Sequence, residues 1–559
     1  MSRPPRRARR GAIALGALVL ALLGRVALTY AVLSVTVDEP RYLAAGLEAV
    51  ETRAFTLYYW SPALPHYCHG LLPSLAGARL PAGTDEGSAA RILDSVPSSA
   101  LLLARLGTLP FLLMLPVYAW LWSSRLFGRT AGLAAAVLVS TLPDVIAHGS
   151  LATSDLPSAA TALAAFFHLW RWCDRPSMAH AALAGAAFAA AALCKGPVIA
   201  QLALVSLAFV VLAGLGRRSA DSRRAVITAG QWAVSVGVAG AAVWLAYGLA
   251  CGPLGARPGA RDALDEALGL PLAARVAGWT VPMPAYFDGL FVVLRLARFG
   301  WRGYLLGSVS ETGWWYYFPV VLALKTPFPF LGLLALAAAR LRVVRHALFR
   351  RRALYPLAAA SVFLGVAMTS RTNIGVRHVL AVEVVLAVVA SAAFLGPWRA
   401  GSLRASWLRG AAVVLIAWQA VESVAAHPDY LAYTNPVARG REWQYLGDSN
   451  VDWAQDVGRL GDYLKANGIV AVRTSPGFDP AGVLRRRGIA ATPIRSATER
   501  PAGVIAASTL SLEGMEPDLS WLQAHSPVAR IGRTIFVYRL PPGRAAAERR
   551  ALRDRMQER

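Results

Sequence analysis

The sequence has few charged side chains: Asp, Glu, Lys and Arg make up 16% of the 559 residues, whereas 56% are hydrophobic. A soluble protein of this length needs a more polar surface, so the composition indicates a polytopic membrane protein. The net charge of +25 does not indicate nucleic-acid binding, because the arginines stand in short blocks between apolar runs. We therefore expect the lipid bilayer, and no nucleic acid, among the partners.

Signatures of several common enzyme classes are also missing. No P-loop, GxSxG or HExxH motif is present, which removes the usual signals of ATP hydrolysis and zinc proteolysis. The four cysteines match no metal-ligand spacing. We expect no cofactor, and a divalent metal is not indicated. Cys68 and Cys251 both fall on the predicted outer side, so a disulfide between them stays open.

One acidic stretch, "DSNVDWAQD", resembles a calcium loop at first sight. A calcium loop needs glycine at its sixth position and glutamate at its twelfth, where this chain has Trp453 and Arg459. The stretch is therefore not an EF-hand, and we expect Asp452 to cap a helix instead.

Apolar runs fill most of the first 426 residues. A spanning helix needs about 20 mostly apolar residues. We expect about 11 such helices, at 11–33, 99–122, 130–147, 156–172, 178–194, 197–215, 225–250, 316–338, 354–370, 378–396 and 408–426. The first run is longer than a usual signal-peptide core, so we interpret it as an uncleaved helix. Every predicted inner loop is basic, which places the N-terminus, with Arg3, Arg6, Arg7, Arg9 and Arg10, in the cytoplasm.

This topology leaves three long segments outside, at about 34–98, 251–315 and 427–559. We expect residues 1–426 to form the membrane domain and the last segment to form a small soluble α/β domain. Within it, "IVAVRT", "GVIAAST" and "RTIFVYRL" predict strands. The stretch "WAQDVGRLGDYL" predicts a helix with one apolar face, formed by Trp453, Val457, Leu460 and Leu464.

Three scarce acids stand at the outer ends of apolar runs. Asp38 and Glu39 follow the first run directly. Loop acids are usually only solvated, but ionisable groups near membrane depth are costly and tend to be functional. A carboxylate there has the chemistry of a general base toward an acceptor hydroxyl. Asp155 opens the fourth run, where spacing alone leaves helix capping and a functional role equally open.

Cations also gather on the predicted outer side, against the positive-inside rule. Lys195 either snorkels to the headgroups or binds a phosphate. The short stretch "SRTNIGVRH" adds Arg371, Arg377 and His378. An anionic ligand at the outer leaflet would explain this grouping, because arginine offers bidentate contacts to phosphate.

The stretch "GWWYYFPVVLALKTPFPF" combines aromatic residues with a deeper cation. Tyr316 belongs to an aromatic cluster of the kind that usually forms an interfacial belt. Lys325 lies farther along the same helix, where a charge faces a cavity rather than lipid.

Six motifs appear in the order shown by one family of membrane enzymes: "VDEP", "HGSLATSD", "LCKGP", "GWWYYFPVVLALKTPFP", "NIGVRH" and "YLGDSNVDWAQD". The chain resembles the GT-C superfamily of polyprenyl-phosphate-sugar-dependent glycosyltransferases. Its nearest likeness is to bacterial relatives of the family 39 protein mannosyltransferases and of the lipid A aminoarabinose transferase. The resemblance implies transfer of a hexose or pentose from a polyprenyl-phosphate donor to a protein, lipid or glycan acceptor. It places this reaction at the outer face of the inner membrane.

The resemblance also implies roles for the residues above. Asp38 is the base or positions the acceptor, Glu39 is the second acid of that motif, and Asp155 is a further outer acid. The leaving phosphate needs cations aimed at its developing charge. The candidate substrate-binding residues are Lys195, Lys325, Arg371, Arg377 and His378, with Arg377 carrying the most weight, together with Tyr316.

The chain departs from the family in two places. Glu383 falls inside the tenth predicted helix, either as the bundle partner of a cation or in another role. The first outer loop lacks the lysine that helps the aminoarabinose transferase hold phosphate. A transporter or flippase for a lipid-linked glycan is the alternative, but it predicts internal repeats and paired broken helices, and the sequence shows neither.

Overall fold

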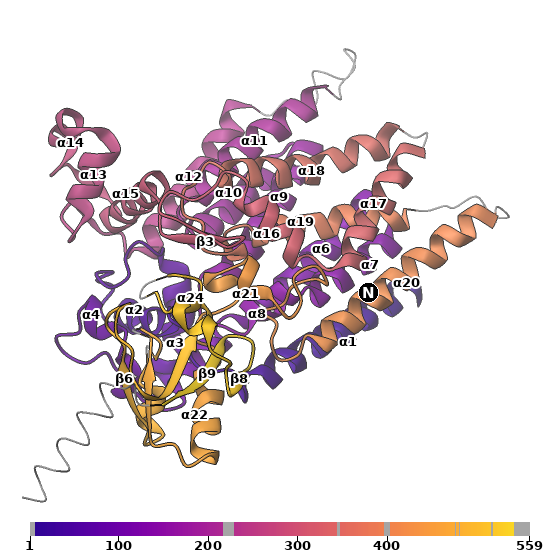
Figure 1. The fold of residues 1–559 in the computed structure, drawn as a ribbon. Helices are drawn as coiled ribbons and strands as arrows, with labels where there is room; N and C mark the ends of the chain where they lie inside the picture. The colour runs from indigo at the N-terminus through magenta and orange to yellow at the C-terminus, as the bar shows by residue number, and fades with distance from the viewer. Residues whose placement is uncertain are drawn as a thin grey trace, which may run out of the picture.

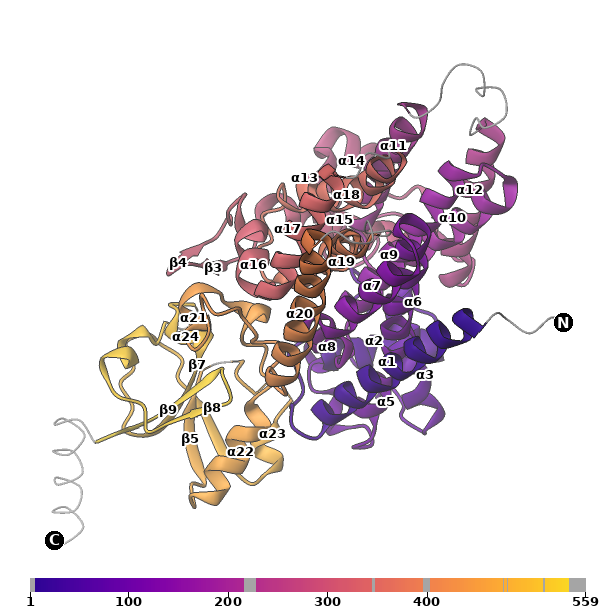
Figure 2. The same ribbon diagram turned by 90° about the vertical axis from the view of Figure 1, so that its right-hand side faces the viewer.

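The computed structural model describes residues 6–215, 228–343, 347–395, 403–475, 477–479, 481–515 and 518–541. Figures 1 and 2 show a bundle of long helices with a sheet at one end. Four arginines of one predicted inner loop, Arg217, Arg218, Arg223 and Arg224, lie outside the described residues, as does the chain from 542 onward.

Each predicted span contains a helix. Among the described residues, five helices are long and apolar enough to cross a membrane, or up to seven if each bent pair is one span. The count is below the predicted one because several helices, such as the buried α19, are short. The bundle consists of α1 (Arg6–Tyr30), α5 (Ala100–Leu106), α6 (Leu109–Phe127), α7 (Arg129–Thr141), α8 (Pro143–Gly149), α9 (Asp155–Asp174), α10 (Met178–Ala192), α11 (Val198–Leu215), α12 (Ala229–Ala246), α16 (Tyr317–Lys325), α17 (Phe328–Val343), α18 (Ala347–Ala367), α19 (Leu380–Ala390) and α20 (Leu403–Ala425).

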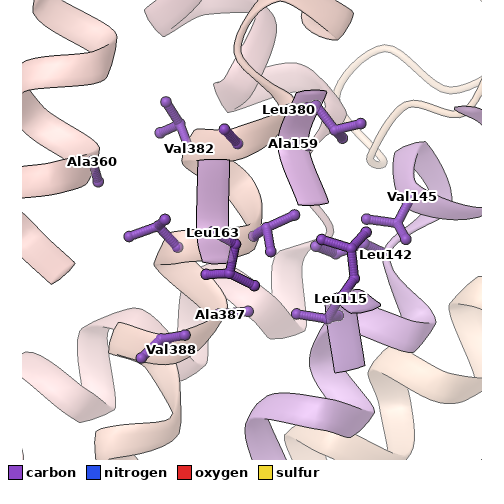
Figure 3. Packing of buried hydrophobic residues seen from close by; sticks show 14 of the residues in the cluster. Leu115, Leu142, Val145, Ala159, Leu163, Ala360, Leu380, Val382, Ala387 and Val388 are labelled. Atoms are coloured by element: carbon purple, nitrogen blue, oxygen red, sulfur yellow. The ribbon is translucent and has the colours of Figure 1, made fainter. Parts of the chain in front are cut away.

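The centre of the bundle is built on α9 and α19. Figure 3 shows Ala159 and Leu163 of α9 beside Val382 and Val388 of α19, all of them buried. Small side chains let neighbouring helices approach closely in a membrane. A methyl group on Gly185 of α10, for example, would lie 2.3 Å from a backbone oxygen of α12.

Two helix pairs are sharply bent, a feature that the sequence did not reveal. The axis turns by 61° between α7 and α8 and by 106° between α16 and α17. Pro143 and Pro327 stand at these breaks. Proline lacks the N–H that would continue a helix and clashes with the preceding turn. The breaks place Asp144 and Lys325 inside the bundle, where both are buried.

Two long connections carry short elements. The first contains α2 (Glu39–Glu51), α3 (Ala63–Leu75), α4 (Glu86–Ala89) and η1 (Ile92–Asp94). The second contains β1 (Cys251–Pro253), α13 (Ala260–Leu268), α14 (Leu270–Val276), β2 (Thr280–Pro282), α15 (Pro284–Phe299), β3 (Gly303–Leu305) and β4 (Ser308–Ser310). Cys68 and Cys251 are both free, so the disulfide left open above is not formed.

The last part of the chain folds around a five-stranded sheet in the order β6-β5-β7-β9-β8. Strands β5, β6 and β7 run parallel, and β8 and β9 form an antiparallel hairpin at one edge. The three predicted strands are β5, β7 and β9. The elements are α21 (Glu442–Tyr445), η4 (Asp448–Asn450), α22 (Val457–Ala466), β5 (Ala471–Thr474), α23 (Val483–Arg486), β6 (Ala490–Pro493), β7 (Gly503–Ser508), α24 (Thr509–Leu512), η5 (Ser520–Ala524), β8 (Ala529–Ile531) and β9 (Ile535–Leu540).

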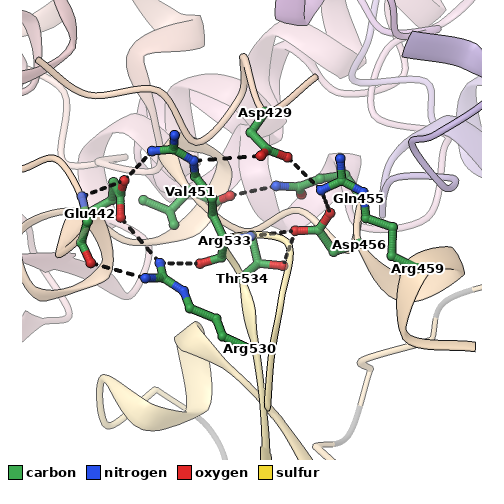
Figure 4. Close-up of polar contacts among 10 residues, drawn as sticks. Asp429, Glu442, Val451, Gln455, Asp456, Arg459, Arg530, Arg533 and Thr534 are labelled. Carbon is green, nitrogen blue, oxygen red and sulfur yellow. Dashed lines mark hydrogen bonds and ion pairs between the residues drawn. The ribbon is translucent and has the colours of Figure 1, made fainter. Parts of the chain in front are cut away.

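The predicted apolar helix face is buried, but α22 begins only at Val457, so Trp453 lies before the helix. Ion pairs fasten the β8–β9 hairpin to the chain that leaves the bundle. Buried Glu442 pairs with Arg530 and Arg533, and Arg533 also reaches Asp429 at 3.7 Å (Figure 4). This network fixes the sheet beside residues 447–456.

Candidate active site

Arg377 joins segments that are far apart in the sequence. It lies in the short helix η2 (Val376–His378), between α18 and α19. Its Nη1 atom lies 2.9 Å from Asp38 Oδ2 and 3.8 Å from Asp155 Oδ2. Its guanidinium stacks over the ring of Trp453, 4.2 Å from the centroid. Three predicted site residues therefore meet, with a tryptophan that the sequence analysis had assigned only to a helix face.

Asp155 settles one open alternative. The residue before it, Ser154, occupies the capping position of α9, and the Asp155 side chain is directed at cations instead. Lys195 Nζ donates a hydrogen bond to Asp155 Oδ1 at 2.7 Å. Asp155 therefore links Lys195 to Arg377, and neither helix capping nor snorkelling describes these residues.

Asp38 is held in place by its backbone neighbours. Val37 N donates to Trp453 O at 3.2 Å, and Ser34 N donates to Gln455 O at 2.8 Å. These bonds pin the start of the first long connection to the chain that precedes α22. The Asp38 side chain keeps 16% of its surface accessible, so it can meet a substrate.

Glu39 has a different environment from its neighbour. It is fully buried, and Arg105 contacts its two oxygens at 2.7 and 2.8 Å. Thr36 N and Ala152 N donate to the same carboxylate at 2.9 and 3.0 Å. Burial raises the pKa of Glu39, but Arg105 and these hydrogen bonds outweigh it and hold the pKa below its usual value. A carboxylate satisfied in this way is a structural anchor, which argues against the predicted catalytic role.

Lys325 also differs from its prediction as a phosphate-binding residue. Its side chain is fully buried, and Nζ contacts Leu431 O at 2.7 Å, Asn450 O at 3.0 Å and Asp144 Oδ1 at 3.0 Å. An ammonium group has three N–H donors, so none is left for a substrate. The residue is a buried cation of the bundle, whereas its depth in the helix had indicated a charge that faces a cavity.

The two adjacent tyrosines separate in the structure. Tyr316 is 37% exposed and its ring packs edge-on against Trp315. Tyr317 is fully buried, and its hydroxyl accepts a hydrogen bond of 2.8 Å from Asn450 Nδ2. Tyr317 therefore contacts the loop beside Arg377, and the substrate contact of Tyr316 stays a prediction.

The remaining cations of the "SRTNIGVRH" stretch lie at different depths. Arg371 is exposed and is held through its backbone, since its N–H donates to Ala297 O at 3.0 Å. His378 is half-buried, and within the described structure its Nε2 atom has no hydrogen-bond partner. The Nε atom of Arg377 is buried and also has no hydrogen-bond partner among the described residues. These two unsatisfied nitrogens lie on adjacent residues, next to the Asp38 and Asp155 carboxylates.

Asp448 is a site residue that the sequence reasoning missed. It adopts a left-handed backbone with φ of +53°, which is uncommon for a residue other than glycine. Burial raises its pKa, and the nearby Arg377 opposes this shift. The sequence analysis considered Asp448 only as part of the calcium-loop motif, which it rejected. Among the described residues, no group of His, Cys, Asp or Glu is arranged to hold a metal ion.

Asp452, from the same stretch, does not cap α22, because Asp456 occupies that position. Its Oδ1 atom accepts the N–H of Ala454 at 3.0 Å instead. Burial raises its pKa to about 7.

One segment of the chain is similar to a family of known chemistry. Residues 91–244, which include Asp155 and Lys195, match the family described as dolichyl-phosphate-mannose-protein mannosyltransferase. Over this segment the chain is similar to GT-C glycosyltransferases. This similarity, together with the apolar helices of the described residues, supports a multi-pass membrane protein whose chemistry is glycosyl transfer from a lipid-linked sugar.

Solved structures of similar architecture include ArnT from Cupriavidus metallidurans in the apo state. It is 15% identical, covers 95% of this chain and 98% of its own, and gives a TM-score of 0.49. The same protein bound to undecaprenyl phosphate is 15% identical over 93% of this chain and 97% of its own, with a TM-score of 0.48. The archaeal oligosaccharyltransferase AglB from Archaeoglobus fulgidus is 13% identical over 95% of this chain and 74% of its own, with a TM-score of 0.44. No curated protein matches the chain.

Proposed function

We propose that this glycosyltransferase moves a hexose or pentose from a polyprenyl-phosphate donor to an acceptor hydroxyl at the outer face of the bacterial inner membrane. The observation that carries the proposal is the chain of contacts Asp38–Arg377–Asp155–Lys195. It combines an accessible carboxylate with two cations, which are the two charges that such a transfer requires.

In this reaction the acceptor oxygen attacks the anomeric carbon of the sugar. Asp38 accepts the hydroxyl proton, and the bond between the anomeric carbon and the phosphate oxygen breaks. The lipid phosphate leaves with the electron pair. Arg377 aims the Asp38 carboxylate through its 2.9 Å contact, while Asp155 holds Arg377 and Lys195 side by side.

The leaving phosphate meets the cationic side of this cluster. Arg377 Nε and His378 Nε2 are two of the buried nitrogens without hydrogen-bond partners in the described residues, and hydrogen bonds to phosphate oxygens would satisfy them. Lys195 adds a point charge, and the exposed Arg371 is suited to meet the donor as it arrives. Fixed donors that face developing charge lower the barrier without reorganisation during the reaction.

The orientation follows from the basic loops of the sequence. We place the N-terminus in the cytoplasm, the membrane domain at 1–426 and the sheet-containing domain at 427–559 on the outer side. The acceptor is a protein, a lipid or a glycan, as in protein glycosylation or lipid A modification. The sheet domain borders the site through Trp453, which positions it to contact the acceptor.

The test is transfer of label from a radiolabelled polyprenyl-phosphate hexose to membrane acceptors, with pentose and diphosphate donors in parallel. Asp38→Asn should lower the rate at least about 100-fold while the protein stays folded. The control is Asp288→Asn, which disrupts another Asp–Arg pair, 3.3 Å long, in the second long connection. Equal rates for wild type and Asp38→Asn would remove Asp38 as the base.

A transporter for a lipid-linked glycan is the second candidate, because the two bent helix pairs are a feature of transporters. Movement of a labelled lipid-linked glycan across vesicle membranes, without covalent transfer, would favour it.

A further inference from the structure

Lys325 is a buried charge that the proposed reaction does not use. It is the last residue of α16, directly before the 106° break, and none of its surface is exposed. Two of its three N–H groups donate to backbone carbonyls of the chain between α20 and α22, those of Leu431 and Asn450. A buried ammonium group that donates hydrogen bonds to backbone carbonyls fixes the position of the backbone that carries those carbonyls.

Asn450 carries this constraint onward to the loop of Arg377. Its Oδ1 atom accepts the N–H of Val376 at 2.8 Å, and its Nδ2 atom donates to Tyr317 OH at 2.8 Å and to Gly447 O at 3.1 Å. Val376 is the residue immediately before Arg377. The path from Lys325 to the Arg377 loop is therefore two consecutive hydrogen-bonded contacts.

Close packing reinforces the same contact. Gly375 has φ of +149°, and a methyl group there would lie 2.2 Å from Ser449 Oγ. Ser449 in turn donates to the carbonyl of Ile374. Residues 374–376 therefore rest directly on 449–450, so a shift of one segment must move the other.

We propose that Lys325 is a positioning residue for Arg377, acting through the hydrogen bonds of Asn450. This inference rests on the proposed function, because it assumes that the placement of Arg377 matters for transfer. Lys325 does not touch the substrate. Its contribution is to hold the Arg377 loop so that the guanidinium meets Asp38 and Asp155 together.

Two carboxylates complicate the obvious substitution. Asp144 of α8 lies 3.0 Å from Lys325 Nζ, and Glu383 of α19 interacts with both of them. Removing only the ammonium leaves buried charge without compensation, which is strongly destabilising in general. Lys325→Met is therefore paired with Lys325→Met/Asp144→Asn, which removes one charge of each sign and still lacks the bonds to the carbonyls. Asn450→Ala breaks the path at its second step and leaves Lys325, Asp144 and Glu383 in place.

The first readout is hydrogen exchange by mass spectrometry in detergent, which needs no activity. Exchange in peptides covering 374–379 should rise at least about 10-fold in Lys325→Met/Asp144→Asn and in Asn450→Ala. The matched control is Arg25→Met, which removes a cation donating to Ser423 O at 2.6 Å, away from the Arg377 loop. It should leave exchange at 374–379 unchanged.

The second readout is the transfer rate. The turnover number of Lys325→Met/Asp144→Asn should fall about 10- to 100-fold, because small displacements of a catalytic group have effects of this size. In an Arg377→Lys background the same pair of substitutions should cost less than about 3-fold, since residues acting through one group are not additive. If Lys325 had only a general structural role, the rate loss from Lys325→Met/Asp144→Asn would multiply with the loss from Arg377→Lys.

Unchanged exchange at 374–379 in both test variants would overturn the proposal, as would multiplying losses in the Arg377→Lys background. If the wild type transfers no sugar from any donor, the proposed function fails, and hydrogen exchange still decides whether Lys325 holds the loop. The two failures are thus distinguishable.

Discussion

The substitution Glu39→Gln tests whether Glu39 has a structural role, in contrast to the catalytic role proposed for its neighbour Asp38. The substitution keeps the side-chain size and one carbonyl oxygen but removes the charge that pairs with Arg105 at 2.7 and 2.8 Å. Both side chains are buried, with 4% of Arg105 exposed and none of Glu39. Removing one partner of a buried ion pair costs about 3–5 kcal/mol, mostly because the other charge stays buried and unpaired.

We therefore expect Glu39→Gln to lower the melting temperature in detergent and the yield of folded protein. The rate of transfer per folded molecule should stay within about 3-fold of wild type, because the carboxylate has no free face toward a substrate. The double variant Glu39→Gln/Arg105→Met should recover part of the lost stability, since no unpaired charge remains.

The assay combines a thermal melt, followed by intrinsic fluorescence, with the radiolabelled transfer reaction on the monodisperse fraction. A Glu39→Gln protein with an unchanged melting temperature and transfer reduced 100-fold or more would refute the structural assignment. It would return Glu39 to the catalytic role that its place beside Asp38 had indicated.

Three further predictions concern other parts of the molecule. Asp155→Asn should lower the turnover number at least about 10-fold, because Lys195 and Arg377 lose their shared anchor; steady-state kinetics with unchanged values would contradict this. Asp452 has a folded pKa of about 7, above the ordinary value of about 3.9, so the folded state holds its proton more tightly and stability falls as pH rises from about 4 to 7. Melting curves across this range should be less pH-dependent for Asp452→Asn, and an identical slope would contradict the effect. Gly70→Ala would place a methyl group 2.0 Å from the Gly46 carbonyl oxygen, so it should destabilise by about 1–3 kcal/mol, measured by thermal melts against Gly240→Ala, whose Cβ meets open space within α12.

The sequence determined the elements of the fold through local chemistry. Apolar runs specified the helices of the bundle, and the β-branched segments specified three strands of the sheet, because both patterns are properties of neighbouring residues. The bent helices at Pro143 and Pro327 were missed, since a proline within an apolar run reveals a possible break but not its angle. Strand β8, three residues long, carries too little pattern to be recognised alone.

The sequence also named most of the site, because charged residues are rare in such a chain and stand out at the ends of apolar runs. Only the tertiary structure decided what each of them contacts. Asp38 and Glu39 are adjacent, yet one stays accessible beside Arg377 and the other is buried against Arg105, because successive residues at the start of a helix point in different directions. Tyr316 and Tyr317 separate for the same reason. The pairing of Arg377 with Asp38 joins residues 339 positions apart, and contacts at that distance depend on how the whole chain packs.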